Sequence, residues 1–344
     1  MILITIHMIW SLNFVDGEFQ IVTDFSHQKN PVIYGTIVIW QDERYGFPDI
    51  FGYDIQKKEE FPLITDSSEQ WSPAINGDRV VWTDYRGGTD NIYYYDLSIT
   101  REIPITSHPA YQYKPAIYEN RVVWEDYRFT TGRLFMYDFI TGKEFQIPTL
   151  AENPSRPQVF ENILVWADNR NGNFDIYGYD FLAHTEFSIS THIAHQVHPV
   201  IYGDRVAWED NRRGNDDIFI YDISEQQEWS ITTNKLQQRF PAIYGTIVVW
   251  QDDRNGNWDI YGFDLATHEE FTIILKDGNQ ILPRIHGTIV VWQDDRNGNW
   301  DIYGIDLSTC YLSQGQKYMK NPNIIFFLIT GIFMLFTLFK YKKR

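Results

Sequence analysis

The chain alternates between short runs of β-branched or aromatic residues and clusters of glycine, asparagine and aspartate. Within residues 241–282 the runs are 242–244, 247–251, 259–263 and 270–274, and turn residues separate them. No run places apolar residues at the 3.6-residue spacing of a helical face, so the pattern predicts strands. Four strands of about five residues, with connections of about three to eight, account for one such unit.

The unit recurs seven times at a period of 42 residues, and the spacing never slips. Its landmarks are a proline that opens the unit, the tryptophan of a Trp-x-Asp-x-Arg motif, and an aspartate that ends the third run. These residues are Pro31, Pro73, Pro115, Pro157, Pro199, Pro241 and Pro283; Trp40, Trp82, Trp124, Trp166, Trp208, Trp250 and Trp292; and Asp54, Asp96, Asp138, Asp180, Asp222, Asp264 and Asp306. The sequence therefore predicts an all-β fold, a seven-bladed β-propeller over residues 16–309.

The seventh unit lacks a fourth run and ends near Thr309. At the other end of the chain, residues 18–23 lie 42 positions before residues 60–65 and match the pattern of a fourth run. We expect residues 18–23 to pair with residues 301–306. This N-terminal strand would close the last blade and remove the exposed strand edges that an open array would leave.

The Trp-x-Asp-x-Arg motif places three side chains on one face of a strand, as in Trp250, Asp252 and Arg254. Seven equivalent copies indicate architecture, because a catalytic centre requires one asymmetric arrangement of residues. We expect each tryptophan to pack between neighbouring blades while the aspartate and arginine pair at the strand end. The Asp-x-x-Asn-Gly-Asn-x-Asp loops are interpreted first as turns, with weak calcium binding as the alternative.

Charge excludes one class of partner. The chain has 29 Lys and Arg against 46 Asp and Glu, a net charge of −17, so it would repel nucleic acid and anionic lipid headgroups. Its single cysteine, Cys310, can form no intrachain disulfide. Aromatic residues make up 17% of the chain, which agrees with a β-rich fold.

Catalytic and cofactor motifs do not occur in the sequence: it contains no Gly-x-Ser-x-Gly, phosphate-binding loop, Cys-x-x-Cys or His-Glu-x-x-His. We therefore expect no enzyme activity, no cofactor and no metal site. His192, His195 and His198, spaced by three, could ligate a metal, but no carboxylate accompanies them and solvated side chains are the simpler interpretation. The third unit replaces Asn-Gly-Asn by residues 129–132 and Asp-Ile by residues 133–134, which is either degeneration or local specialisation.

Residues 250–264, WQDDRNGNWDIYGFD, resemble the TolB-like propeller repeat, whose core is Ser-Asp-Arg-x-Gly-x-x-Asp-Ile-Tyr. The resemblance covers residues 18–309, although Tyr-Gly-Thr or Gly-Asp-Arg replaces the Ser-Pro-Asp-Gly turn common in that family. This variant looks like the repeats of archaeal cell-surface propeller proteins. The resemblance implies a surface binding or scaffolding role. Because some similar propellers hold a metal through several histidines at the channel mouth, it also implies an alternative, a carbohydrate-active lyase or hydrolase.

Residues 324–339 form an uncharged apolar run that four basic residues follow, Lys340, Lys342, Lys343 and Arg344. A helix of this length spans only ~24 Å against a hydrocarbon core of ~30 Å, and snorkelling by Lys340 can close the gap. We expect residues 324–344 to form a C-terminal transmembrane helix with a cytoplasmic basic tail, after a linker over residues 310–323, with the propeller outside the cell.

The first 14 residues are apolar enough for the central region of a signal peptide, although they lack a basic start and a small-residue cleavage site. Residues 1–15 are accordingly interpreted as a signal peptide or its remnant. The anchor and this segment together predict a cell-membrane protein with an extracellular propeller.

One face of the propeller is the candidate binding surface. If the first strand of each unit is innermost, the connection between fourth and first strands and the loop after Trp-x-Asp-x-Arg emerge together. Six units carry a glutamine three residues before the proline, with Pro154 in the fourth unit instead. Aromatic residues next to glycine and asparagine suit sugar rings or peptide backbones. The candidate ligand-binding residues are Gln28, Gln70, Gln112, Gln196, Gln238, Gln280, Phe47, Phe174, Trp258 and Trp300.

The alternative is that the glutamines cap the inner strands and the aromatic residues wedge between blades. The function that we expect is non-enzymatic binding or adhesion, with an extracellular protein or glycan as the partner.

Overall fold

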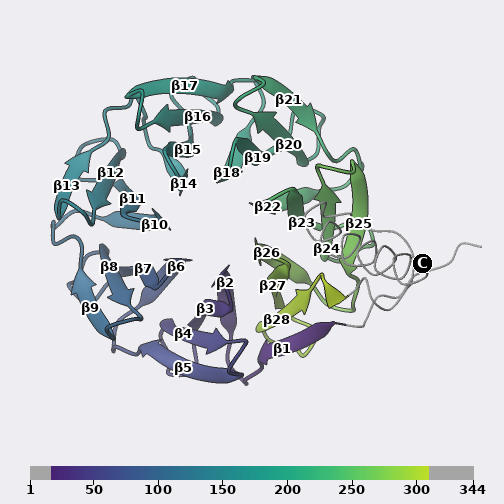
Figure 1. The fold of residues 1–344 in the computed structure, drawn as a ribbon, viewed down its shortest axis with the longest axis horizontal. Coiled ribbons are helices and arrows are strands. Elements are labelled where there is room, and N and C mark those ends of the chain that lie inside the picture. The colour runs from purple at the N-terminus through teal and green to yellow at the C-terminus, as the bar shows by residue number, and fades with distance from the viewer. Residues whose placement is uncertain (1–16, 310–344) are drawn as a thin grey trace, which may run out of the picture.

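The computed structural model describes residues 17–309, which form a ring of seven four-stranded antiparallel sheets (Figure 1). Blade 1 consists of strands β2–β5, and blades 2 to 6 follow in groups of four up to β25. Blade 7 contains β26–β28 together with β1. The predicted seven-bladed propeller is confirmed.

Each blade runs outward from the centre in chain order, so that the first strand is innermost (Figure 1). The innermost strands are β2 (Gln28–Tyr34), β6 (Gln70–Asn76), β10 (Gln112–Tyr118), β14 (Ser155–Phe160), β18 (Gln196–Tyr202), β22 (Gln238–Tyr244) and β26 (Gln280–His286). The second strands are β3 (Ile37–Asp42), β7 (Arg79–Asp84), β11 (Arg121–Asp126), β15 (Ile163–Asp168), β19 (Arg205–Asp210), β23 (Ile247–Asp252) and β27 (Ile289–Asp294).

The third strands are β4 (Asp49–Asp54), β8 (Asn91–Asp96), β12 (Arg133–Asp138), β16 (Asp175–Asp180), β20 (Asp217–Asp222), β24 (Asp259–Asp264) and β28 (Asp301–Asp306). The fourth, peripheral strands are β5 (Glu59–Ile64), β9 (Arg101–Pro104), β13 (Lys143–Gln146), β17 (Thr185–Ser190), β21 (Gln227–Ser230), β25 (Glu269–Ile274) and β1 (Glu18–Val22). Every strand has four to seven residues, as the short apolar runs predict.

The predicted ring closure is confirmed, because β1 pairs antiparallel with β28, with Glu18 opposite Ile305 and Gln20 opposite Tyr303. Phe19 packs over Gly304: a Cβ placed on that glycine would lie 2.9 Å from Cζ of the ring. The same phenylalanine-on-glycine contact joins the third and fourth strands of blade 1, where Phe61 covers Gly52. The N-terminal strand thus reproduces the packing of a regular fourth strand.

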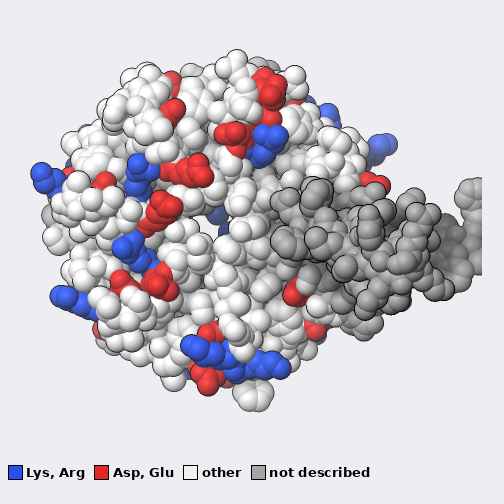
Figure 2. All heavy atoms as spheres, viewed as in Figure 1, with Lys and Arg blue, Asp and Glu red and all other residues white. Residues whose placement is uncertain are grey.

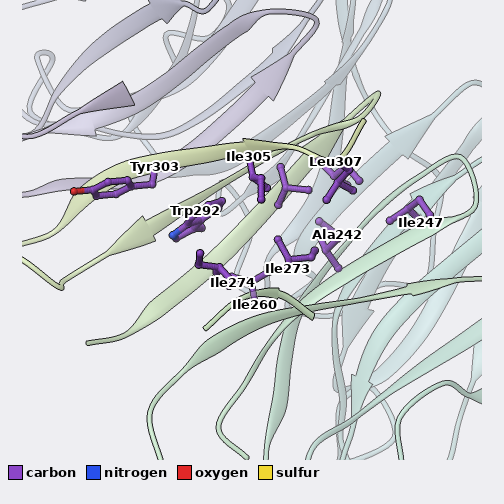
Figure 3. Close-up of a cluster of buried hydrophobic side chains, with 12 residues drawn as sticks. Ala242, Ile247, Ile260, Ile273, Ile274, Trp292, Tyr303, Ile305 and Leu307 are labelled. Carbon is purple, nitrogen blue, oxygen red and sulfur yellow. The ribbon is translucent and has the colours of Figure 1, made fainter. Parts of the chain in front are cut away.

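The seven tryptophans lie between blades, as expected, and each has no exposed surface. Figure 3 shows Trp292 of β27 in one cluster with Ile260, Ile273 and Ile274, which belong to blade 6. Burial of such a large side chain from both sides holds adjacent blades together through the hydrophobic effect.

Each tryptophan also begins a series of hydrogen bonds and ion pairs that ends on the fourth strand. In blade 1 the carboxylate of Asp42 accepts hydrogen bonds from Trp40 Nε1 at 2.9 Å and from Arg44 Nη2 at 2.7 Å. Arg44 then pairs with Glu60 of β5 at 2.6 Å. The arginine of every blade has such a partner: Glu60, Glu102, Glu144, Glu186, Glu228, Glu270 and, in blade 7, Glu18 of β1.

The prolines do not open the inner strands, which differs from the sequence-based prediction. Six of these strands begin at the glutamine three residues before the proline, and the ladder register shifts around the proline, as between Lys29 and Val32. Proline has no N–H to donate, so the strand bulges there. The residue before it has φ near 50° and donates its own N–H to the preceding blade in most cases, as Ser72 does to Gln41 Oε1 at 3.2 Å.

Three predicted segments lie outside the described residues: the signal peptide at 1–15, the linker at 310–323 and the membrane anchor at 324–344. Within residues 17–309, no helix is long and apolar enough to cross a membrane.

Candidate ligand-binding face

The two predicted groups of loops emerge side by side on one face of the ring. Gln70 N, at the start of β6, donates to Pro48 O in the loop between β3 and β4 at 2.7 Å. Tyr85 N, just after β7, donates to Glu69 O in the connection before β6 at 3.0 Å. These bonds run within and between blades, so the connection before each inner strand and the loops after the second strands form one continuous surface.

The six glutamines do not reach that surface, since none has any exposed area. The amide of Gln70 donates to Ser68 O at 2.6 Å, and that of Gln238 donates to Leu236 O at 2.7 Å. This geometry is that of a cap at the start of an inner strand. In five of the six, the amide oxygen has no hydrogen-bond partner among the described residues: Gln28, Gln70, Gln196, Gln238 and Gln280.

The four aromatic candidates occupy two different repeat positions. Phe174, Trp258 and Trp300 are equivalent and partly buried, and their carbonyl groups accept the N–H of the next inner strand, at 2.7 Å for Trp258 and Gln280. Phe47 lies one position earlier in its loop, at the place of Asn257, and is 50% exposed. Both positions fall in the loop between the second and third strands of a blade.

Phe47 lines an open pocket of about 550 Å³ in blade 1. The pocket lies between the loop that joins β3 to β4 and the connection that joins β5 to β6. We call it the blade 1 pocket; its lining residues are Tyr45, Phe47, Asp49, Pro62, Thr65, Asp66 and Ser67.

The blade 1 pocket lies where the repeat is broken. In blade 6 the carboxyl of Asp259 accepts from Asn255 at 2.8 Å and from Asn257 at 3.3 Å. Tyr45 and Phe47 stand at these two asparagine positions in blade 1, so Asp49, the equivalent of Asp259, loses both donors.

Asp49 is only 1% exposed, one of its oxygens is fully buried without a partner, and no hydrogen bond or ion pair to it is found among residues 17–309. Burial, together with the nearby carboxylates of Asp42 and Asp66, raises the pKa of Asp49 to about 6. A carboxyl group that is buried, unpaired and open to a pocket is a frequent mark of a functional site. The sequence carried a signal for this site in the paired exchange of asparagine for tyrosine and phenylalanine.

Other blades that depart from the Asn-Gly-Asn loop compensate for the change. Blade 2 has Asn91 in place of the acid, and its amide donates to Thr89 O at 3.0 Å. Blade 3 has Arg133 there, which donates to Ala151 O at 2.7 Å. Blade 5 keeps Asp217 but places Arg213 within 3.9 Å of it. Blade 1 differs from these blades because no described residue forms a hydrogen bond or ion pair with its acid.

The three histidines that could have formed a metal site do not share one. His198 Nδ1 contacts Glu209 Oε1 at 2.5 Å, whereas His195 Nδ1 accepts from Phe174 N at 3.2 Å and His192 Nδ1 accepts from Ala194 N at 3.1 Å. Across the described part of the chain, no three His, Cys, Asp or Glu side chains are placed to hold a metal ion.

The central hollow has a different character from the blade 1 pocket. Figure 2 shows that one face of the molecule is open at its centre, with basic atoms in the depth of the opening. Arg156 of β14 reaches within 5.7 Å of the Phe240 ring of β22, two blades further on. Burial and the charge of Arg156 lower the pKa of Arg284 on β26 to about 10. Neither guanidinium forms an ion pair with a carboxylate of residues 17–309, although the charges of Glu209 and Glu125 act on Arg156.

Comparison with known proteins supports the fold. Neither a protein-family model nor the sequence of a curated protein matches the chain. TolB from Acinetobacter baumannii is 15% identical with a TM-score of 0.53, over 69% of this chain and 62% of TolB. The chain therefore matches less than two thirds of the length of TolB.

Two further structures match more of the ring. An oligogalacturonate lyase in complex with manganese is 12% identical, with a TM-score of 0.67 over 84% of this chain and 93% of the lyase. The propeller domain of the trilobed protease from Pyrococcus furiosus is 12% identical, with a TM-score of 0.68 over 83% of this chain and 94% of that domain. At these identities the likeness shows a TolB-like seven-bladed propeller fold, and it extends to both enzymes and non-enzymes.

Proposed function

We propose that this protein is a non-enzymatic, membrane-anchored, extracellular propeller that binds a protein or glycan with the face formed by the connections before the inner strands. The observation that carries this proposal is the blade 1 pocket, an opening on that face lined by the exposed rings of Tyr45 and Phe47. Trp258 and Trp300 add partly exposed indole rings in blades 6 and 7. Aromatic rings beside amide groups are typical of surfaces that bind sugars or peptides.

The cellular location in this proposal rests on the sequence. The apolar run at 324–339, the basic residues after it and the resemblance to archaeal cell-surface propellers support a C-terminal anchor with the propeller outside. The net charge of −17 argues against nucleic acid as the partner.

Replacing Trp258 and Trp300 together with alanine should abolish ligand capture while the melting temperature falls by only a few degrees, because both rings are partly exposed. Capture would be measured on glycan arrays and on immobilised cell-surface proteins with the full-length chain. Leu182→Ala is the control, since Leu182 is 72% exposed in the turn between β16 and β17, at the opposite end of the strands. A large loss of stability without a selective loss of capture would show that the two tryptophans are structural.

Protease added to intact cells should remove the propeller, while an epitope tag placed after Arg344 remains protected, because the basic tail is expected in the cytoplasm. Immunoblots of shaved and permeabilised cells would measure this. A full-length product recovered in the soluble cytosolic fraction would contradict the topology.

A surface carbohydrate-active enzyme is the second candidate, and one observation favours it: Asp49 has a pKa of about 6 and lines a pocket, as a general acid or base would. One protein of the same fold is an oligogalacturonate lyase. Release of shortened or unsaturated oligosaccharides from acidic polysaccharides by the wild-type protein, and its loss in Asp49→Asn, would support this candidate over simple binding.

A further inference from the structure

We propose that the blade 1 pocket binds a primary ammonium group, that of a lysine side chain on a partner protein. This inference rests on the proposed function, because it names the ligand chemistry of one site on the binding face. In blade 1 a set of hydrogen-bond acceptors lacks the side-chain donor that blades 4 to 7 supply themselves.

In blades 4 to 7, one asparagine amide nitrogen lies against three acceptors. Asn299 Nδ2 contacts Asp24 O and Ser26 O at 2.7 Å each and Asp301 Oδ1 at 3.1 Å. Asn215 Nδ2 in blade 5 contacts Leu236 O at 2.8 Å, Asn234 O at 3.0 Å and Asp217 Oδ1 at 3.3 Å. Two carbonyl groups and one carboxylate thus form a repeated acceptor site.

Blade 1 has the same chain positions without the amide. The equivalents of the three acceptors are the carboxyl of Asp49 and the carbonyl groups of Asp66 and Ser68, while Phe47 stands where the asparagine would be. An ammonium group has three N–H donors and a positive charge, so it can serve all three acceptors, which an amide with two N–H donors cannot.

The walls of the pocket favour an organic cation over a bare metal ion. Tyr45 is 68% exposed and Phe47 50% exposed, and such rings attract cations and cover an aliphatic stem. Pro62 adds apolar lining. The hydrogen bonds from Ser68 lower the pKa of Asp66, so this second carboxylate stays charged near neutral pH. A lysine side chain combines the apolar stem and the charge that this lining requires.

Two other blades show that cationic side chains fit this region. Arg133 of blade 3 donates to Ala151 O, a carbonyl of the connection after its own fourth strand. Arg213 of blade 5 lies 3.9 Å from Asp217, the equivalent of Asp49. The chain itself supplies a cation in those blades, whereas in blade 1 the cation would come from the partner.

The direct test titrates the full-length chain with Nα-acetyl-lysine methylamide and follows binding by calorimetry at pH 7.5. We expect a dissociation constant on the order of 1 mM, and no binding of the norleucine analogue, which has the stem without the charge. Asp49→Asn should weaken binding at least about tenfold. Asp259→Asn is the matched control, because the same exchange in blade 6 should leave binding unchanged.

A second variant separates loss of binding from loss of folding. Phe47→Asn restores the residue that blades 4 to 7 carry, so its amide should bond Asp49 and the two carbonyl groups. We expect this variant to have a higher melting temperature than the wild type and to lose lysine binding. Loss of binding in a more stable protein cannot come from misfolding.

Binding should also weaken as the pH falls below about 6, because protonation of Asp49 removes its charge. The charged groups that act on Asp49 are Asp42 of β3 and Asp66 of the connection before β6, and Arg44 is held by Asp42 and Glu60. Without ligand, the raised pKa means that Asp49 stabilises the fold below pH 4 and that this stabilisation is lost as the pH rises through about 6. Asp49→Asn should therefore raise the melting temperature at pH 7 more than at pH 4.

Equal binding by wild type and Asp49→Asn, equal binding of the norleucine analogue, or a response to glucosamine or calcium chloride alone would each overturn the lysine assignment. The proposed function can survive this outcome. If capture on the arrays still depends on Trp258 and Trp300 while the pocket ignores lysine, the face binds its partner and only the chemistry assigned to the pocket is wrong.

Discussion

Deleting residues 1–23 is expected to lower the melting temperature by about 10 °C or more, because it removes β1 from blade 7. The deletion takes away the ladder with β28, the burial of Ile21 and Val22, and the contact of Phe19 with Gly304. Each such apolar side chain contributes about 1.5–3 kcal/mol. For a protein of this size, about 1 kcal/mol corresponds to about 2–4 °C, so the three together account for the effect.

Thermal unfolding followed by circular dichroism would measure this loss. A chain that lacks only residues 1–16 keeps β1 and is the control. Phe19→Ala should give a smaller loss of about 1.5–3 kcal/mol, since it leaves the backbone ladder but removes the ring that packs over Gly304. A truncated protein without β1 that melts at the wild-type temperature would contradict closure through β1.

Replacing one repeat aspartate should be nearly as damaging. Asp252 is fully buried and accepts from Trp250 Nε1 at 3.2 Å, from Arg254 Nη2 at 2.5 Å and from the backbone N–H of Arg254 at 3.0 Å. Asp252→Ala leaves the indole N–H without its acceptor and the guanidinium with Glu270 alone. Removing one partner of a buried ion pair costs about 3–5 kcal/mol, so we expect that loss in the free energy of unfolding.

Urea unfolding at pH 7 would give the change in the free energy of unfolding. The control is Glu269→Ala, because Glu269 is exposed on β25 in the same blade and its removal should change stability by less than about 0.5 kcal/mol. A loss of similar size in both variants would mean that the hydrogen bonds of Asp252 to Trp250 and Arg254 contribute no special stability.

The sequence predicted the fold well because a repeated period constrains all seven blades at once. A position that departs from the repeat in one unit can be compared with the same position in the six other units. A four-stranded unit fits the spacing of the proline, tryptophan and aspartate. The boundary of the inner strands was wrong by three residues. Proline ends most strands, but here the backbone bulges around it and the strand continues.

The candidate site was predicted less well. The two groups of loops lie side by side as predicted, and Phe47 lines a pocket there, but the six glutamines lie beneath the surface. Their regular spacing gave no information on which way the side chains turn. The sequence did not single out Asp49, because five of the seven blades carry an aspartate at this repeat position and a repeated residue is interpreted as structural.

The sequence by itself determined the number of blades, their strand order and the closing role of residues 18–23, since these follow from spacing along the chain. Only the tertiary structure decided which polar groups find partners. The pairing of each repeat arginine with a glutamate of the fourth strand, and the isolation of Asp49, depend on side chains from separate strands and connections that meet in space. Because the free energy of a buried carboxyl group depends on the donors within hydrogen-bond distance, the exchanges at positions 45 and 47 leave Asp49 without the two amide donors that its equivalent in blade 6 has.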